Sequence, residues 1–279
     1  MSKKVYEMVT DVIIEKLKEG TIPWRKPFVN GVAVNWKTQK EYRGINIMLL
    51  EPGEYATFKQ IKEAGGKVKK GEKSSIVVFW KMLDIEDEKT GEKERVPLLR
   101  YYRVFKIGEQ TEGIEPKRKQ QYYNHNEIEK AEEIIENYIG KPTIGHKNNG
   151  AYYQPFHDHV NVPPKSSFPK LHDFYNVLFH ELIHSTGHAS RLNREGITNF
   201  DKFGSNRYSK EELVAEVGAT MLSSIVGIER QTIDNSASYI NSWLRALEND
   251  KTLIVKASQQ AQKACDYIQG ISYEKKAVS

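Results

Sequence analysis

The sequence predicts an α+β protein of two domains, and three observations support this prediction. Two runs rich in β-branched and aromatic residues, 75–83 and 96–107, lie close together and are expected to pair as antiparallel strands. Apolar residues at helical spacing dominate the second half of the chain. A polar stretch, 116–126, has the composition of a linker. We therefore expect an N-terminal mixed α/β domain at 1–115, with a small antiparallel sheet, and a helix-rich C-terminal domain at 127–279.

The composition is that of a folded protein, and its charge is unevenly distributed. The 279 residues are 38% hydrophobic and 28% charged, values that exclude a disordered chain. Residues 1–120 hold 25 Lys and Arg against 18 Asp and Glu, a balance of +7, whereas the remaining 17 and 19 give −2. An anionic partner for the N-terminal domain is therefore a fair inference.

The same features predict a cytoplasmic protein without a membrane span. No apolar run reaches the roughly 18 residues that a transmembrane helix needs, and the N-terminus lacks the apolar core of a secretory signal. Cys265 is the single cysteine, so no disulfide can form within the chain.

The N-terminal domain is expected to begin with a helix. Apolar residues at helical spacing predict an amphipathic helix over 3–19. A second helical pattern covers 45–63 and is interrupted by Pro52 and Gly53. The two predicted strands follow, with a charged connection at 84–95 between them, so that they form a hairpin.

Aromatic and basic residues alternate in three short segments of this domain. The six residues concerned are Trp24, Arg25, Lys26, Trp36, Tyr42 and Arg43. Single-stranded nucleic acid is held by aromatic rings that stack on bases, at roughly 1–3 kcal/mol each, and by cations that follow the backbone. These residues are therefore candidate nucleic-acid contacts. The alternative is that the rings belong to the core and the cations are solvated neighbours.

In the C-terminal domain, helices are expected at 127–139, 170–186 and 209–226, with two more in the tail. Between the first two helices, 151–162 is expected to be an edge strand, because it contains Pro155. Its two histidines, His157 and His159, could bind a metal ion, but exposed positions on the strand explain them better.

The helix over 170–186 carries the pattern His-Glu-x-x-His. His180 and His184 are four residues apart and therefore share one face of a helix, where both imidazoles can bind one Zn²⁺. Glu181 lies about 100° around the helix, close enough to reach a water on that metal. This is the arrangement of a metal-dependent peptidase, in which the metal polarises a peptide carbonyl and Glu181 acts as the general base.

A catalytic zinc needs a third ligand from the protein. The extended form of the motif would place a histidine at position 190, which is Ser190. His188 is an alternative, but it would need a sharp turn back towards the metal. We favour Glu212, which stands 28 residues after His184 on the helix over 209–226. Glu216, one turn later, is expected to hydrogen-bond a ligand imidazole and fix its ring.

Three further expectations concern the surroundings of this site. Ser209 and Glu212 match a capping-box pattern, and since Glu212 is assigned to the metal, Ser209 is expected to cap the helix alone. Tyr208 and His188 are both candidates for stabilising the oxyanion, and the pattern does not choose between them. The strand over 151–162 is expected to hold an extended peptide by strand addition.

Taken together, the chain resembles the ArdC-like antirestriction proteins of conjugative plasmids and related mobile elements. In the first half the resemblance lies in Gly-Thr-Ile-Pro-Trp-Arg-Lys-Pro, Tyr-Arg-Gly-Ile-Asn and Tyr-Tyr-Arg-Val-Phe. In the second half it lies in His-Glu-Leu-Ile-His-Ser-Thr-Gly-His and Tyr-Ser-Lys-Glu-Glu-Leu-Val-Ala-Glu. The resemblance covers nearly the whole chain, with the motifs in the right order.

The resemblance implies an N-terminal domain that binds single-stranded DNA and a C-terminal zincin-like metallopeptidase domain that binds zinc. It also implies protection of incoming DNA from restriction, and a relative of the N-terminal domain occurs in plasmid-transfer primases. The expected partners are single-stranded DNA and an unidentified protein substrate, such as a component of a restriction system. The alternative is a DNA-binding protein whose zinc is structural and whose protective effect needs no proteolysis.

Overall fold

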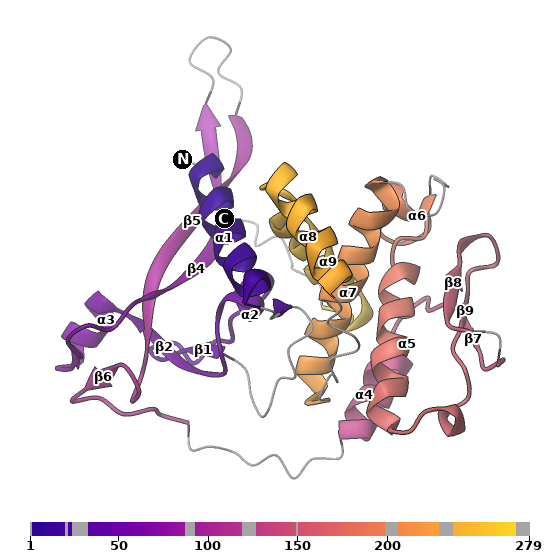
Figure 1. The fold of residues 1–279 in the computed structure, drawn as a ribbon, viewed down its shortest axis with the longest axis horizontal. Coiled ribbons are helices and arrows are strands. Elements are labelled where there is room, and N and C mark those ends of the chain that lie inside the picture. Colours follow the sequence, from indigo (N-terminus) through magenta and orange to yellow (C-terminus); the bar gives the residue numbers. More distant parts are fainter. Residues whose placement is uncertain are drawn as a thin grey trace. The chain divides into compact units, whose positions relative to one another are not determined.

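A computed structural model describes residues 2–19, 22–23, 33–86, 93–118, 127–148, 150–198, 206–228 and 237–271. The chain forms two compact units of mixed helix and sheet, which confirms the predicted α+β organisation (Figure 1). The first unit gathers residues 1–23, 32–121 and 238–255, and the second gathers 24–31, 122–237 and 256–279. Residues 238–255, which the sequence assigned to the C-terminal domain, therefore group with the first unit. The domain boundaries proposed from the sequence stay a prediction.

The first unit is built on a four-stranded sheet in the order β1-β2-β5-β4. Its strands are β1 (Ala33–Asn35), β2 (Gly53–Thr57), β4 (Ser75–Glu86) and β5 (Lys93–Lys106). β4 and β5 pair antiparallel, from Ser75 opposite Val104 to Glu86 opposite Lys93, which confirms the predicted hairpin. β2 pairs antiparallel with β5 and parallel with β1. Two shorter strands, β3 (Lys67–Val68) and β6 (Thr111–Glu112), form a separate pair.

The helices of this unit confirm one prediction and correct another. α1 (Ser2–Lys18) is the predicted first helix, and its apolar stripe is buried at Val5, Val9, Ile13 and Leu17. The predicted helical region over 45–63 was wrong in part, because it forms α2 (Asn46–Leu49), then β2, then α3 (Phe58–Glu63). The strand arises because pairing with β5, distant in sequence, satisfies the β2 backbone.

A segment near the C-terminal end of the chain completes the first unit. α8 (Ala237–Asn249) is the first predicted tail helix, and Trp243 and Leu247 are buried on it. After this helix, the backbone oxygen of Lys251 accepts a hydrogen bond of 2.6 Å from the Thr10 hydroxyl of α1. The Lys251 ammonium lies 2.7 Å from the Asp11 carboxylate. These contacts explain why the tail groups with the N-terminal residues.

Apolar side chains cover both faces of the first sheet. One face carries a buried cluster of Ala33, Tyr42, Leu50, Tyr55, Val77 and Val104. The other carries Ala56, Ile61, Ile107 and Ile114, with Trp36 and Phe105 packed against them. The chain stays attached to this unit as far as Arg118, whose guanidinium donates to the backbone oxygen of Gln39 at 2.9 Å. Residues 116–118 of the predicted linker are thus held here, and 119–126 lie outside the described residues.

The second unit contains a three-stranded sheet in the order β7-β9-β8. Its strands are β7 (Thr143–Gly145), β8 (Tyr152–Gln154) and β9 (His159–Asn161). The prediction of a single edge strand over 151–162 was therefore wrong. Pro155 begins a 3₁₀ turn (Pro155–His157) that separates two short strands, and Asp158 completes the reversal with a φ of +45°. β8 lies at an edge of the sheet and β9 lies at its centre.

Helices supply most of the core of this unit. They are α4 (Glu127–Asn137), α5 (Leu171–Ser185), α6 (Glu195–Thr198), α7 (Asn206–Val226) and most of α9 (Leu253–Ile268). α5 and α7 pack together, and Gly218 of α7 lies against the Ile183 side chain of α5. Across the described ranges, none of the helices combines the length and apolar content that crossing a bilayer requires.

Candidate metal centre

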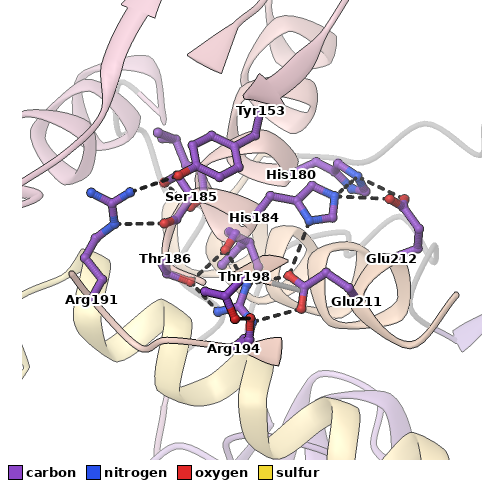
Figure 2. Close-up of polar contacts among 12 residues, drawn as sticks. Tyr153, His180, His184, Ser185, Thr186, Arg191, Arg194, Thr198, Glu211 and Glu212 are labelled. Carbon is purple, nitrogen blue, oxygen red and sulfur yellow. Dashed lines mark hydrogen bonds and ion pairs between the residues drawn. The ribbon is translucent and has the colours of Figure 1, made fainter. Parts of the chain in front are cut away.

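The His-Glu-x-x-His motif lies on α5, as predicted. His180 and His184 are one helical turn apart, and their Nε2 atoms lie 3.1 Å from each other. The two rings meet edge to face, with centroids 4.8 Å apart. Figure 2 shows both imidazoles directed towards the same point, where the side chain of Glu212 also arrives from α7.

Glu212 completes a group of three donors. Its carboxylate oxygens lie 3.5 Å from Nε2 of His180 and 3.3 Å from Nε2 of His184. A tetrahedral metal ion bound at about 2.0–2.2 Å holds its ligand atoms about 3.3–3.6 Å apart, so these separations suit a shared divalent cation. Among the described residues, His180, His184 and Glu212 are the group of His, Cys, Asp and Glu side chains that meets the distance requirement for a metal. The position of these residues supports Glu212 as the third ligand.

The other nitrogen of His184 has its own partner. Nδ1 of His184 lies 3.3 Å from the Glu211 carboxylate, and Glu211 is buried. A proton on Nδ1 would bond to that carboxylate and leave the lone pair of Nε2 directed at the group of ligands. Glu211 thus takes the position that the sequence analysis gave to Glu216, and the role of Glu216 stays a prediction.

Arg194 holds Glu211 in place. Its Nε donates to Oε2 of Glu211 at 3.0 Å, and its Nη2 donates to Oε1 at 2.5 Å. The same guanidinium donates to the Thr186 hydroxyl at 2.6 Å (Figure 2). It also donates to the backbone oxygen of Ile183 at 2.8 Å. The motif alone does not reveal Glu211. The available signal was a carboxylate at 211 on the apolar side of α7, in helical spacing with Val214, Ala215 and Gly218.

The carboxylates set the protonation of this site. Burial opposes a charge on His184, but Glu211 and Glu212 outweigh it and raise the pKa of the imidazole to about 10. Burial also opposes the charge on Glu212, yet His180 and His184 hold its pKa well below the usual range. The pKa of Glu211 is likewise lowered, against burial, by His184 and Arg194. Glu211 and Glu212 are therefore ionised, and Glu212 is available as an anionic ligand.

Glu181 lies next to the ligands without joining them. Its side chain is buried, with 8% of its surface exposed, and burial raises the pKa of its carboxyl group. The carboxylate accepts a hydrogen bond from the backbone N–H of Tyr153 on β8. The edge strand of the small sheet is therefore adjacent to the predicted general base.

Arg191 fixes the hairpin of β8 and β9 to the end of α5. The guanidinium donates to both oxygens of Asp158 and to the Tyr153 hydroxyl at 3.3 Å. Its Nε donates to the backbone oxygen of Ser185 at 2.8 Å. Figure 2 shows this second arginine beside Tyr153 and Ser185, apart from Arg194 and Glu211. The arrangement holds the edge strand at a set distance from the motif helix.

The remaining expectations around the site are resolved in part. His188 contacts Ser190 through Nδ1, at 2.8 Å from the hydroxyl, and does not join the group of ligands. α7 begins at Asn206, so Ser209 lies within the helix and the prediction that Ser209 caps it was wrong. The side chain of Tyr208 lies outside the described residues. His157 is exposed, and His159 contacts the Thr143 hydroxyl at 2.8 Å.

The predicted nucleic-acid contacts lie in the first unit, except for Trp24, Arg25 and Lys26, which lie outside the described residues. Tyr42 is 5% exposed within a core cluster, so its ring is covered and its position favours the structural alternative. Trp36 donates from Nε1 to the backbone oxygen of Glu115, and the Lys117 ammonium lies 4.1 Å from its ring centroid. Arg43 is half-buried.

Family models match both halves of the chain. The family model described as the N-terminal domain of anti-restriction factor ArdC matches residues 3–105. The model described as a zincin-like metallopeptidase matches residues 129–260. A DNA primase TraC of Escherichia coli is 34% identical over 99% of this chain, but the chain spans only 20% of that primase. The uncharacterized protein y4eC of Sinorhizobium fredii is 32% identical, and the match covers 95% of this chain and 91% of that protein.

Solved structures agree with these matches. The metal-free antirestriction protein ArdC of plasmid R388 has 36% sequence identity and a TM-score of 0.73, with 95% of this chain and 97% of that chain covered. The Mn(II)-bound form of the same protein has a TM-score of 0.72 and covers 97% and 98%. A metal-bound relative and a zincin-like domain agree with a divalent metal at the group of ligands described above. The chain therefore belongs to the ArdC family of antirestriction proteins.

Proposed function

We propose that this chain is an antirestriction protein that couples single-stranded DNA binding to a zinc-dependent peptidase site. One observation carries the peptidase part: the candidate ligand atoms of His180, His184 and Glu212, spaced 3.1–3.5 Å apart, lie beside a buried carboxyl group at Glu181. Two histidines and one glutamate form the ligand set of a catalytic zinc site, because they leave one coordination position open.

The residues of the chain then define the reaction. Zinc bound there would supply a Lewis acid that polarises a peptide carbonyl and acidifies water. Glu181 is placed to take a proton from the attacking water and to return it to the leaving amine. Its burial raises the pKa of the carboxyl group, which suits a group that must both accept and release a proton. An extended peptide paired with the outer edge of β8 would lie next to this carboxylate.

DNA binding is proposed for the first unit. The match to the ArdC N-terminal domain and the balance of +7 over residues 1–120, from 25 Lys and Arg and 18 Asp and Glu, both support an anionic partner. Protection of entering DNA places the protein in the cytoplasm, in agreement with a single cysteine. A component of a restriction system is the class of protein substrate that fits this role.

A second candidate function is protection without proteolysis, with a structural metal. It is favoured by the buried pair of Glu211 and Arg194, which ties the ligand His184 into the core as in a structural site. The names of the matched primase and of the ArdC structure refer to priming and to antirestriction, and neither names a peptide substrate.

Replacing Glu181 by Gln separates the two functions, because it removes the base and keeps the ligands. The full-length protein and the variant would be compared for zinc content, for cleavage of a library of unstructured peptides, and for transfer of plasmid DNA into restricting cells. Peptidase function predicts one zinc per chain in both proteins, with cleavage and protection lost in the variant. Unchanged protection without any cleavage would establish the structural alternative.

A further inference from the structure

One face of the β4 and β5 hairpin exposes aromatic rings. Residues opposite each other on antiparallel strands share a face, and the pairs here are Ser75 with Val104, Val77 with Tyr102 and Phe79 with Arg100. Val77 and Val104 belong to the buried cluster on this face. Further along the same face, Phe79 is 44% exposed and Tyr102 is 46% exposed. The core therefore ends within the hairpin, and two large rings continue beyond it.

The exposed rings are supported from below. Phe79 and Tyr102 meet edge to face, with centroids 5.8 Å apart and an angle of 66°. Phe79 also contacts the buried ring of Tyr42, with centroids 6.0 Å apart. Tyr42 in turn packs edge to face on Tyr55, at 6.4 Å. Contacts between rings hold their orientation, so the two exposed rings present a preformed surface.

The charge beside these rings is positive. Arg100 is exposed and lies directly opposite Phe79. Among the positions of this face whose side chains the structure describes (75, 77, 79, 100, 102, 104 and 106) none is acidic. The other cation among these positions, Lys106, lies 2.6 Å from Glu109 and is therefore neutralised nearby. Within this described part of the face, the positive charge of Arg100 thus stands next to the rings.

We propose that Phe79, Tyr102 and Arg100 form the stacking surface for the bases of single-stranded DNA. The inference rests on the proposed DNA binding of this chain and assigns it to a face of the sheet. Exposed rings beside a cation match unpaired bases and a phosphate backbone, whereas the bases of a duplex are already stacked on each other. Tyr42 then supports Phe79 from the core rather than contacting a base itself.

The test compares matched variants of the full-length protein in fluorescence anisotropy with a labelled oligothymidine of about 20 nucleotides. A base stacked on one ring contributes about 1–3 kcal/mol, so Tyr102→Ala and Phe79→Ala should each weaken binding about 5- to 150-fold. Tyr102→Phe and Phe79→Tyr should retain it. Arg100→Gln should lower the slope of log affinity against log salt by about 1.

Tyr101→Ala is the matched control. Tyr101 is 38% exposed and neighbours Tyr102, but it pairs with Val78 and so lies on the opposite face of the sheet. Its removal should leave the affinity unchanged. Thermal unfolding of each variant shows whether it is folded, and if Phe79→Ala is not, the more exposed Tyr102→Ala decides the question alone.

The possible results distinguish the proposed stacking surface from the proposed DNA binding of the chain. No binding by the unmodified protein overturns both. Binding that survives Tyr102→Ala, or that falls equally in Tyr101→Ala, overturns the stacking surface and leaves DNA binding in place. Equal affinity for a duplex of the same length also overturns it, since paired bases cannot stack on the rings. Loss of single-strand affinity confined to Phe79, Tyr102 and Arg100 establishes the surface.

Discussion

The guanidinium of Arg194 donates hydrogen bonds to both carboxylate oxygens of Glu211, at 3.0 and 2.5 Å, in the interior beside the proposed metal site. Both side chains are buried. Glu211 in turn lies 3.3 Å from Nδ1 of His184, whose other nitrogen faces the metal position. The orientation of a ligand imidazole therefore depends on an ion pair that lies one residue away from another ligand, Glu212, on α7.

Replacing Glu211 by Gln should weaken metal binding about 10- to 100-fold, the usual effect of losing a carboxylate that orients a ligand histidine. Gln keeps the shape of the side chain but removes the charge that holds a proton on Nδ1 of His184. The affinity is measured by competition with a coloured chelator. Glu216→Gln is the comparison, because the sequence pattern assigned this role to Glu216. A larger loss in Glu216→Gln would restore the sequence prediction and exclude Glu211.

The ion pair itself needs a separate control, because Glu211→Gln leaves Arg194 charged and buried. Breaking one partner of such a pair costs about 3–5 kcal/mol, while removing both is often close to neutral. The double variant Glu211→Gln with Arg194→Met should therefore recover stability without recovering metal affinity. Recovery of both would attribute the effect to folding alone.

The proposed metal ligands on α5 could be predicted from the sequence, because four-residue spacing is a local property of a helix. The prediction of Glu212 required the further assumption that a second helix packs against the motif helix, and the position of Glu212 near the histidines agrees with it. Glu211 was missed because the choice between neighbouring carboxylates depends on how α7 is rotated against α5. That rotation is set by packing contacts such as the one between Gly218 and Ile183, which no local pattern contains.

The N-terminal sheet shows the same limit. The long hairpin of β4 and β5 was predictable, since its strands are rich in β-branched and aromatic residues and close in sequence. β1 and β2 are only three and five residues long and gain their stability from partners elsewhere in the chain. Tyr42 was a candidate for stacking on bases because the basic residue Arg43 follows it, but its ring is buried in the core.

Gly218→Ala tests the packing that brings the two ligand helices together. In an open helix this change stabilises by about 1 kcal/mol. Here an added Cβ would lie 2.7 Å from Cδ1 and 2.8 Å from Cγ1 of Ile183, so we expect destabilisation of about 1–3 kcal/mol from overpacking. Thermal unfolding and metal affinity should both fall. Ile183→Val in the same chain should recover part of the loss, and strictly additive effects would show that the two side chains do not meet.

Metal binding should release a proton from His184. The pKa of this imidazole is about 10 because Glu211 and Glu212 favour its charged form against burial, and a ligand imidazole must be neutral. Affinity should therefore rise about tenfold per pH unit between about pH 7 and 9. Calorimetry in buffers of different ionisation enthalpy measures the released protons directly. Binding without proton release at pH 8 would contradict the charged state of His184.

The same shift sets the stability of the metal-free protein. A histidine whose pKa is raised from 6.5 to about 10 on folding contributes fully below pH 6.5, and its contribution disappears as the pH rises through about 10. Metal-free protein should thus lose stability between these values, whereas His184→Gln should show a flatter profile. An equal slope in both proteins would place the effect elsewhere.

Asn46 should prove essential to the edge of the first sheet. Its side-chain amide donates to the backbone oxygen of Val78 at 2.9 Å and accepts from the Val78 N–H at 2.7 Å, so it replaces a missing neighbouring strand at β4. Asn46→Ala leaves two buried backbone groups without these bonds, at about 1–3 kcal/mol each. Hydrogen exchange of the Val78 amide should accelerate strongly, while Arg43→Ala, in the same motif, should leave it protected. An unchanged exchange rate in Asn46→Ala would show that water replaces the two Asn46 hydrogen bonds without loss of protection. The asparagine of this motif would then have a role other than stabilising the sheet edge.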